Sequence, residues 1–103
     1  MLRREDLYNI KLVLRMIHSV TVAVVNQADI SWCLGIWKNW LTRLICICVD
    51  DNQRKWALEN IPRQDLIMIQ TLYHNERENP KFETLFPALI SMGFIKQIEF
   101  EEN

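Results

Sequence analysis

The chain has 103 residues, of which half are hydrophobic and 24% are charged. This composition is typical of one folded domain and excludes an intrinsically disordered chain. The net charge of −1 lacks the excess of Lys and Arg that is typical of nucleic-acid-binding proteins, so we do not expect sequence-specific binding of DNA or RNA.

The first predicted helix runs from Arg4 to Asn26. Residues suited to burial recur there at steps of three and four, which places them on one helical face; they are Leu7, Ile10, Leu14, Ile17, Thr21 and Val24. His18 is on the polar side and is expected at the surface. The longest apolar run, Met16 to Val25, is too short to span a bilayer, so no transmembrane segment is expected.

The second predicted helix contains three of the four tryptophans, is capped by Asp29 or Ser31 and ends near Val49. Its strongly polar residues form one narrow strip, so the remaining side chains are expected to face the core; the strip consists of Lys38, Asn39, Thr42 and Arg43. Trp32 and Trp40 are therefore predicted core anchors. Trp37 borders the strip, and the alternative to burial is a partner-binding surface made by Trp37, Lys38 and Arg43.

The three cysteines, Cys33, Cys46 and Cys48, are predicted to be buried free thiols in a reducing compartment. They are odd in number and contain no Cys-x-x-Cys pair. Their spacing with His18 and His74 matches no common zinc pattern, so no metal is expected.

Two further helices are expected in the next thirty or so residues. A break at residues 50–52 provides the cap for a third helix, in which Trp56 is a predicted core anchor. Pro62 favours the start of a fourth helix, because proline lacks the amide hydrogen that the first helical turn leaves unused. Leu66 is the first predicted core residue of this fourth helix.

The fifth predicted helix is capped by Thr84 and holds Pro87 in its first turn. Phe86 is expected to face the core, and Gly93 to end the helix. Residues 94–103 mix apolar and acidic side chains and are predicted to form a short C-terminal tail. An alternative role for this tail is an arm that adds to a partner or to a second copy of the chain in a homodimer.

The expected fold is all-α, a compact single-domain bundle of about five helices over residues 1–103, with the helices between residues 4 and 93. A nucleophile beside a base, a pair of carboxylates in a cleft or a glycine-rich phosphate loop would indicate an enzyme, and the sequence contains none of these patterns. We therefore expect a protein that is not an enzyme and needs no cofactor. No signal peptide is recognisable, so the expected location is the cytosol, with passage to the nucleus left open.

Three short stretches stand out by their order and spacing. They are Ile30-Ser31-Trp32 at the head of the second helix, the run from Ala57 to Arg63 followed by Leu66, and the run from Leu85 to Leu89 with Gly93 after it. Together they resemble the C-terminal half of the C proteins of morbillivirus-related paramyxoviruses. In those proteins a Leu-Ser-Trp, an Ile-Pro-Arg helix junction and a proline-containing last helix occupy the corresponding places.

The resemblance implies a small accessory protein, translated from a frame that overlaps the phosphoprotein gene. Such proteins are not enzymes; they damp viral RNA synthesis, limit interferon signalling and support particle production. The implied partners are host signalling proteins and the viral polymerase and phosphoprotein complex. The implied location is the host cytoplasm, with the nucleus and the virion as further locations. Family members usually bring a basic N-terminal region, and activities of that region are not carried over to this chain.

Two other functions remain open on the residue pattern alone. One is a cellular all-helical adaptor that binds a peptide or a partner helix in a groove. The other is a helix-turn-helix DNA binder around Leu58 to Tyr73. The second is disfavoured, because Arg63 is the only base in its recognition helix.

Overall fold

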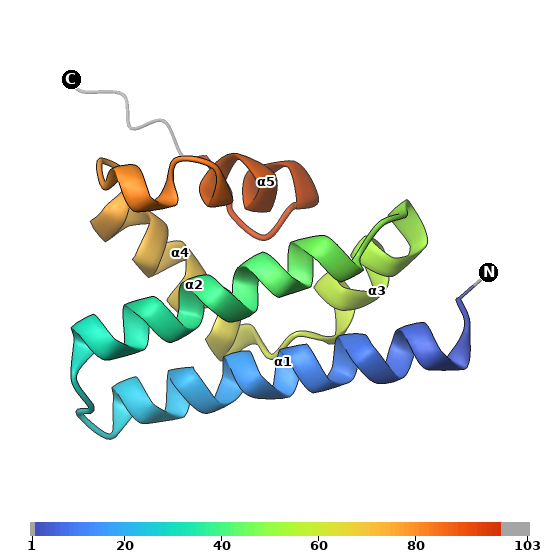
Figure 1. Cartoon of the computed structure of the whole chain (residues 1–103), viewed down its shortest axis with the longest axis horizontal. Coiled ribbons are helices and arrows are strands. Elements are labelled where there is room, and N and C mark those ends of the chain that lie inside the picture. The colour runs from blue at the N-terminus through green and yellow to red at the C-terminus, as the bar shows by residue number, and fades with distance from the viewer. Residues whose placement is uncertain (1, 98–103) are drawn as a thin grey trace.

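The computed structural model describes residues 2–97. Within these residues there are five α-helices and one short 3₁₀ helix (Figure 1); they are α1 (Arg4–Val25), α2 (Ile30–Ile47), α3 (Asp51–Asn60), α4 (Arg63–Glu76), the 3₁₀ helix Pro80–Phe82 and α5 (Leu85–Met92). The described part of the chain contains no strand. The predicted all-α, single-domain bundle is therefore confirmed.

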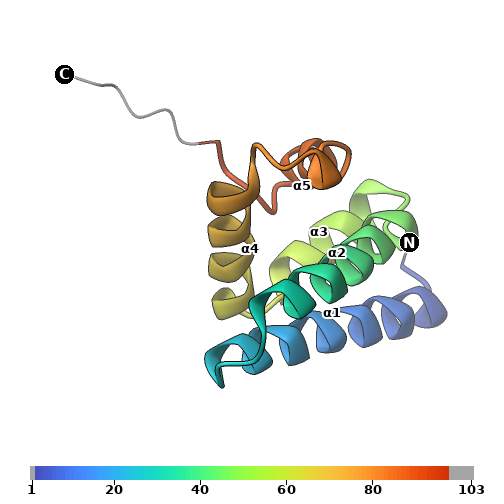
Figure 2. The ribbon, with the colours of Figure 1, turned by 60° about the vertical axis from the view of Figure 1, so that its left-hand side comes forward.

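The two longest helices, α1 and α2, form an antiparallel hairpin (Figures 1 and 2). α1 buries one face, as its spacing predicted; the buried residues are Ile10, Val13, Leu14, Ile17, Val20 and Thr21. In the turn, Gln27 adopts the left-handed backbone conformation, with φ at 65°. Asp29 then caps α2, because its side chain accepts a hydrogen bond of 3.1 Å from the amide of Trp32. The predicted cap at Asp29 is confirmed.

α2 packs against α1 on one side and α5 on another, whereas α4 stands beside the hairpin (Figure 2). One stripe of α2 is buried, at Cys33, Trp37, Leu41 and Leu44. These residues recur at steps of four and three, so they follow a single helical face. The prediction that the side chains outside the polar strip face the core is correct for these four residues.

The break between α2 and α3 contains a reciprocal capping interaction. The Asp50 side chain accepts a hydrogen bond of 2.8 Å from the Gln53 amide, and the Gln53 side chain accepts from the Asp50 amide. This pairing satisfies amide groups that the first turn of a helix leaves without partners. Pro62 immediately precedes α4, as predicted, and Leu66 is half-buried against the core.

Phe86 lies in the core, as predicted, and is 4% exposed. Its ring stacks on Phe82 with centroids 5.0 Å apart and meets Tyr73 edge-on at 5.2 Å. Pro87 lies in the first turn of α5. Gly93 ends this helix in the left-handed conformation, with φ at 89°, so the predicted end is confirmed. Thr84 directly precedes the helix as predicted, but its side chain forms no capping hydrogen bond.

The prediction of a tail from residue 94 onwards is wrong for its first residues. Phe94 and Ile95 are 3% and 2% exposed and belong to the core. The backbone of Lys96 is also fixed, because its amide donates to Gln70 Oε1 at 2.9 Å and its carbonyl accepts from Gln70 Nε2 at 2.8 Å. The rest of the predicted tail, residues 98–103, lies outside the described residues.

By length and composition, α1 is the one helix in residues 2–97 that is long and apolar enough to cross a membrane. The core helix of a folded domain meets the same criteria. In this fold, six residues of α1 are buried against the other helices.

Candidate interaction surfaces

The predicted partner-binding residues Trp37, Lys38 and Arg43 do not form one exposed surface. Trp37 is 3% exposed and belongs to the core, so its prediction as a partner contact is wrong. Lys38 is half-buried and Arg43 is exposed. Successive residues of a helix are about 100° apart, and this rotation places Trp37 on the buried stripe of α2 while Arg43 lies off it.

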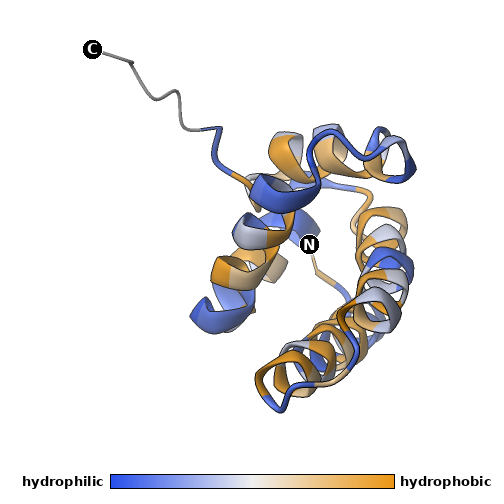
Figure 3. Cartoon of the chain, turned by 90° about the vertical axis from the view of Figure 1, so that its left-hand side faces the viewer, coloured by the Kyte–Doolittle hydropathy of each residue, from blue (hydrophilic) through white to orange (hydrophobic). Residues whose placement is uncertain are grey.

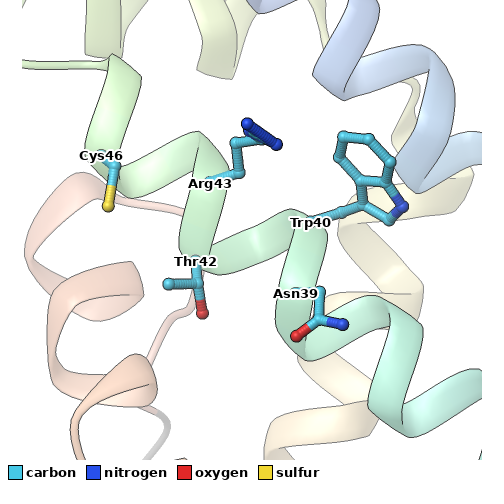
Figure 4. Close-up of a pocket in the computed structure, with 5 residues that line it drawn as sticks. All are labelled: Asn39, Trp40, Thr42, Arg43 and Cys46. Atoms are coloured by element: carbon cyan, nitrogen blue, oxygen red, sulfur yellow. The ribbon is translucent and has the colours of Figure 1, made fainter.

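Arg43 belongs to a shallow depression of about 410 Å³ on the outer side of α2 (Figure 4). Asn39, Trp40, Thr42 and Cys46 also line it. The guanidinium carbon of Arg43 lies 5.9 Å from the ring centroid of Trp40, and the two side chains extend to the same side of the helix. Trp40 is half-buried against the core, so its predicted role as an anchor is correct only in part.

Trp32 is 60% exposed, and its prediction as a core anchor is wrong. It directly precedes Cys33 of the buried stripe, so its side chain points about 100° away from that stripe. The exposed side of α2 is wider than the predicted polar strip. The exposed side of α2 also includes Trp32 and Gly35.

Three apolar side chains are exposed around the turn between α1 and α2. Val25, Ile30 and Trp32 are 55%, 53% and 60% exposed, and we call this region the hairpin end. A turn of only four residues, 26–29, joins the last residue of α1 to the start of α2. Figure 3, which views the molecule from this side, shows that hydrophobic residues of α1 and α2 continue up to the turn. Apolar side chains gathered at a surface are typical of interaction sites.

A cavity of about 100 Å³ adjoins the hairpin end, between α1, α2 and α4. Ile30, Trp37 and Met68 are among the residues that line it. The indole nitrogen of Trp37 is buried and has no hydrogen-bond partner within residues 2–97. Buried N–H groups are usually paired, so the core beneath the hairpin end contains an unsatisfied donor.

His18 and Asp65 form a contact that the sequence analysis did not predict. Nδ1 of His18 lies 3.2 and 3.1 Å from the two carboxylate oxygens of Asp65. The Asp65 side chain is completely buried, and that of His18 is 43% exposed. Asp65 is in the first turn of α4, where the helix dipole favours negative charge. Because a carboxylate only accepts, Nδ1 carries the shared hydrogen and Nε2 remains for other partners.

His18 also lines an open groove of about 360 Å³, which we call the basic groove; its other lining residues are Lys11, Leu14, Arg15, Trp56, Asn60 and Pro62. Nζ of Lys11 lies 5.9 Å from the centroid of a Trp56 ring. Trp56 is half-buried, so it is a core anchor only in part. The spacing of Lys11, Arg15 and His18 places them on one helical face. No local signal in the sequence indicates that Trp56 lies beside them.

The cysteines are free, as predicted, but they are not all buried. Cys33 and Cys48 are buried, whereas Cys46 is exposed in the depression on α2. Burial raises the pKa of the Cys48 thiol to about 11, opposed by the nearby positive charge of Arg54. Within residues 2–97, no group of three or more His, Cys, Asp or Glu side chains is arranged to hold a metal ion.

Comparisons of the chain with protein-family models, with curated proteins and with solved structures gave no match.

Proposed function

We propose that this chain is a viral accessory protein that lowers viral RNA synthesis and antagonises host interferon signalling through protein contacts. Its resemblance to paramyxovirus C proteins supports the proposal. Each matched stretch lies at a helix start: Ile30 begins α2, Pro62 precedes α4, and Pro87 is in the first turn of α5. The proposed activity needs no catalytic group. Its partners are host signalling proteins and the viral polymerase and phosphoprotein complex.

The hairpin end is the observation that carries this proposal. A protein that acts by contact needs exposed apolar surface that a partner can remove from water. Tryptophan is enriched among the residues that dominate binding energy at interfaces, and Trp32 is the largest side chain at the hairpin end. We therefore assign the main partner contact to Val25, Ile30 and Trp32 rather than to Trp37.

A cellular helical adaptor is the second candidate, and the cavity beside the hairpin end favours it. That cavity is lined mainly by apolar side chains from three helices, so it suits an apolar side chain of a partner helix. The encoding nucleic acid separates the two candidates. A second open frame across this region supports the viral accessory protein, and a locus with introns supports the adaptor.

Two reporters in transfected cells test the proposed activity. One measures RNA synthesis by a paramyxovirus polymerase on a minigenome, and the other measures an interferon-responsive promoter. We expect the chain to lower both signals in proportion to its expression. Leu44→Asp is the folding-defective control, because Leu44 is completely buried. Unchanged signals at high levels of folded protein would contradict the proposal.

A further inference from the structure

We propose that the basic groove binds an acidic segment of a partner protein in which carboxylates alternate with apolar residues. The groove is formed by α1, α3 and the Asn60–Pro62 turn, and is therefore a different surface from the hairpin end. The proposal does not rest on the proposed viral function.

The positive charge of the groove favours an anionic ligand. Lys11 and Arg15 are exposed, and neither forms an ion pair within residues 2–97. No carboxylate lines the groove. Asp65, whose carboxylate contacts His18, is completely buried and does not line the groove. A ligand therefore meets two free cations and the outward Nε2 of the imidazole.

Asp65 positions His18 for this role. The contact between Nδ1 and the buried carboxylate fixes the orientation of the ring and leaves Nε2 as its remaining polar atom. A ligand carboxylate can accept a hydrogen bond from Nε2 only when that nitrogen also carries a hydrogen.

Apolar surface beside these charges favours a peptide. Leu14, Trp56 and Pro62 line the groove next to the cations. Two free cations are too few for the many phosphate contacts on which nucleic-acid affinity depends, and a nucleic acid offers little for Leu14 or Pro62 to contact. A peptide that carries both carboxylates and apolar side chains complements both kinds of surface.

The spacing of the cations fits an extended peptide. Lys11 and Arg15 are one helical turn apart, which is about 6 Å along the axis of α1. In an extended chain, residues i and i+2 point to the same side and are about 7 Å apart. A Glu-x-Glu sequence therefore places one carboxylate near each cation on α1, and it directs the side chain between them to the opposite side, where Trp56 and Pro62 line the groove. His18 lies three residues beyond Arg15, about 4 to 5 Å further along the axis, and is available to a third carboxylate.

Titration of the ¹⁵N-labelled chain with a capped peptide of sequence Glu-Leu-Glu-Leu-Glu tests the proposal. We expect the indole signal of Trp56 and the amide signals of residues 11, 15 and 18 to shift, while the indole signal of Trp32 stays in place. The joint Lys11→Ala and Arg15→Ala variant should weaken binding about tenfold. His18→Gln should also weaken it, because glutamine keeps a polar group but loses the ring that Asp65 orients.

The matched control is the joint variant Arg77→Ala and Lys81→Ala. It removes two exposed cations outside the groove and should leave the affinity unchanged. If this control weakened peptide binding equally, the effect would come from the net charge of the protein alone, and the proposal would be overturned. Equal binding of the uncharged peptide Gln-Leu-Gln-Leu-Gln would also overturn the proposal. Tighter binding of a six-nucleotide uridine strand to the same groove would overturn it as well. Circular dichroism of each variant verifies the fold.

Discussion

Nδ1 of His18 lies 3.1 Å from Oδ2 of Asp65, although 47 positions separate the two residues in the chain. It is the only contact between a carboxylate and a basic side chain within residues 2–97 that joins two helices. The contact links the middle of α1 to the first turn of α4. Since a buried carboxylate without a partner is costly, this contact ties the placement of α4 to that of α1.

A double-mutant cycle measures the coupling between His18 and Asp65. We expect His18→Ala to cost about 2 kcal/mol of unfolding free energy, because it leaves a buried carboxylate unpaired. In the background of Asp65→Ala, which removes the acceptor, the same substitution should cost less than about 0.5 kcal/mol. Urea denaturation of the four proteins gives the coupling. Additive effects of the two substitutions would mean that the contact does not stabilise the fold.

Trp32 and Leu44 should differ strongly in their effect on stability. Trp32→Ala is expected to cost less than about 1 kcal/mol, because its side chain is 60% exposed. Leu44→Ala should cost about 2 to 5 kcal/mol, because Leu44 is completely buried and its truncation leaves a cavity. Chemical denaturation of both variants checks the order. A loss of several kcal/mol on truncation of Trp32 would place it in the core after all.

The two glycines should respond to alanine in opposite directions. Gly93 has φ at 89°, and a Cβ there would lie 3.2 Å from Leu58 Cδ2. Gly93→Ala should therefore destabilise the fold by about 1 to 2 kcal/mol. Gly35 is exposed within α2 and has open space around it, so Gly35→Ala should stabilise by up to about 1 kcal/mol. Melting temperatures that shift in the same direction would disagree with this backbone geometry.

Cys46 should be the first cysteine to react with iodoacetamide. It is exposed, whereas Cys33 and Cys48 are buried. The thiolate is the reactive form, and burial raises the pKa of Cys48 to about 11, so Cys48 remains a thiol at pH 8. Mass spectrometry should find one modified cysteine in the folded protein and three after denaturation in urea. Modification of Cys48 at the rate of Cys46 would refute its burial.

Local signals predicted most of the helix boundaries. Asp29 caps α2 through its own side chain, and Gly93 ends α5 because glycine adopts a positive φ without strain. Pro87 was placed correctly because the first helical turn does not need its missing amide. Each of these interactions involves residues within a few positions of one another, so the local sequence is enough to predict where each helix begins or ends.

The surfaces depend on how the helices pack, and the local sequence pattern predicts them less well. Trp32 was predicted to lie in the core and is 60% exposed, whereas Trp37, for which burial and a partner contact were both left open, is 3% exposed. α2 is apolar around most of its circumference, so periodicity alone did not select the buried side. The contact between His18 and Asp65 joins helices that are far apart in the chain, and no local pattern indicates it.

The interferon-responsive reporter, measured with variants of the hairpin end, shows whether exposed apolar side chains at this end of the molecule are needed for repression. The joint variant Ile30→Ser and Trp32→Ser removes exposed apolar surface at the hairpin end, whereas the control Val49→Ser and Ile67→Ser removes it elsewhere. Both should fold, since all four side chains are more than half exposed. We predict that the hairpin-end variant loses most of the repression and that the control keeps it. Full repression by the hairpin-end variant would contradict the account.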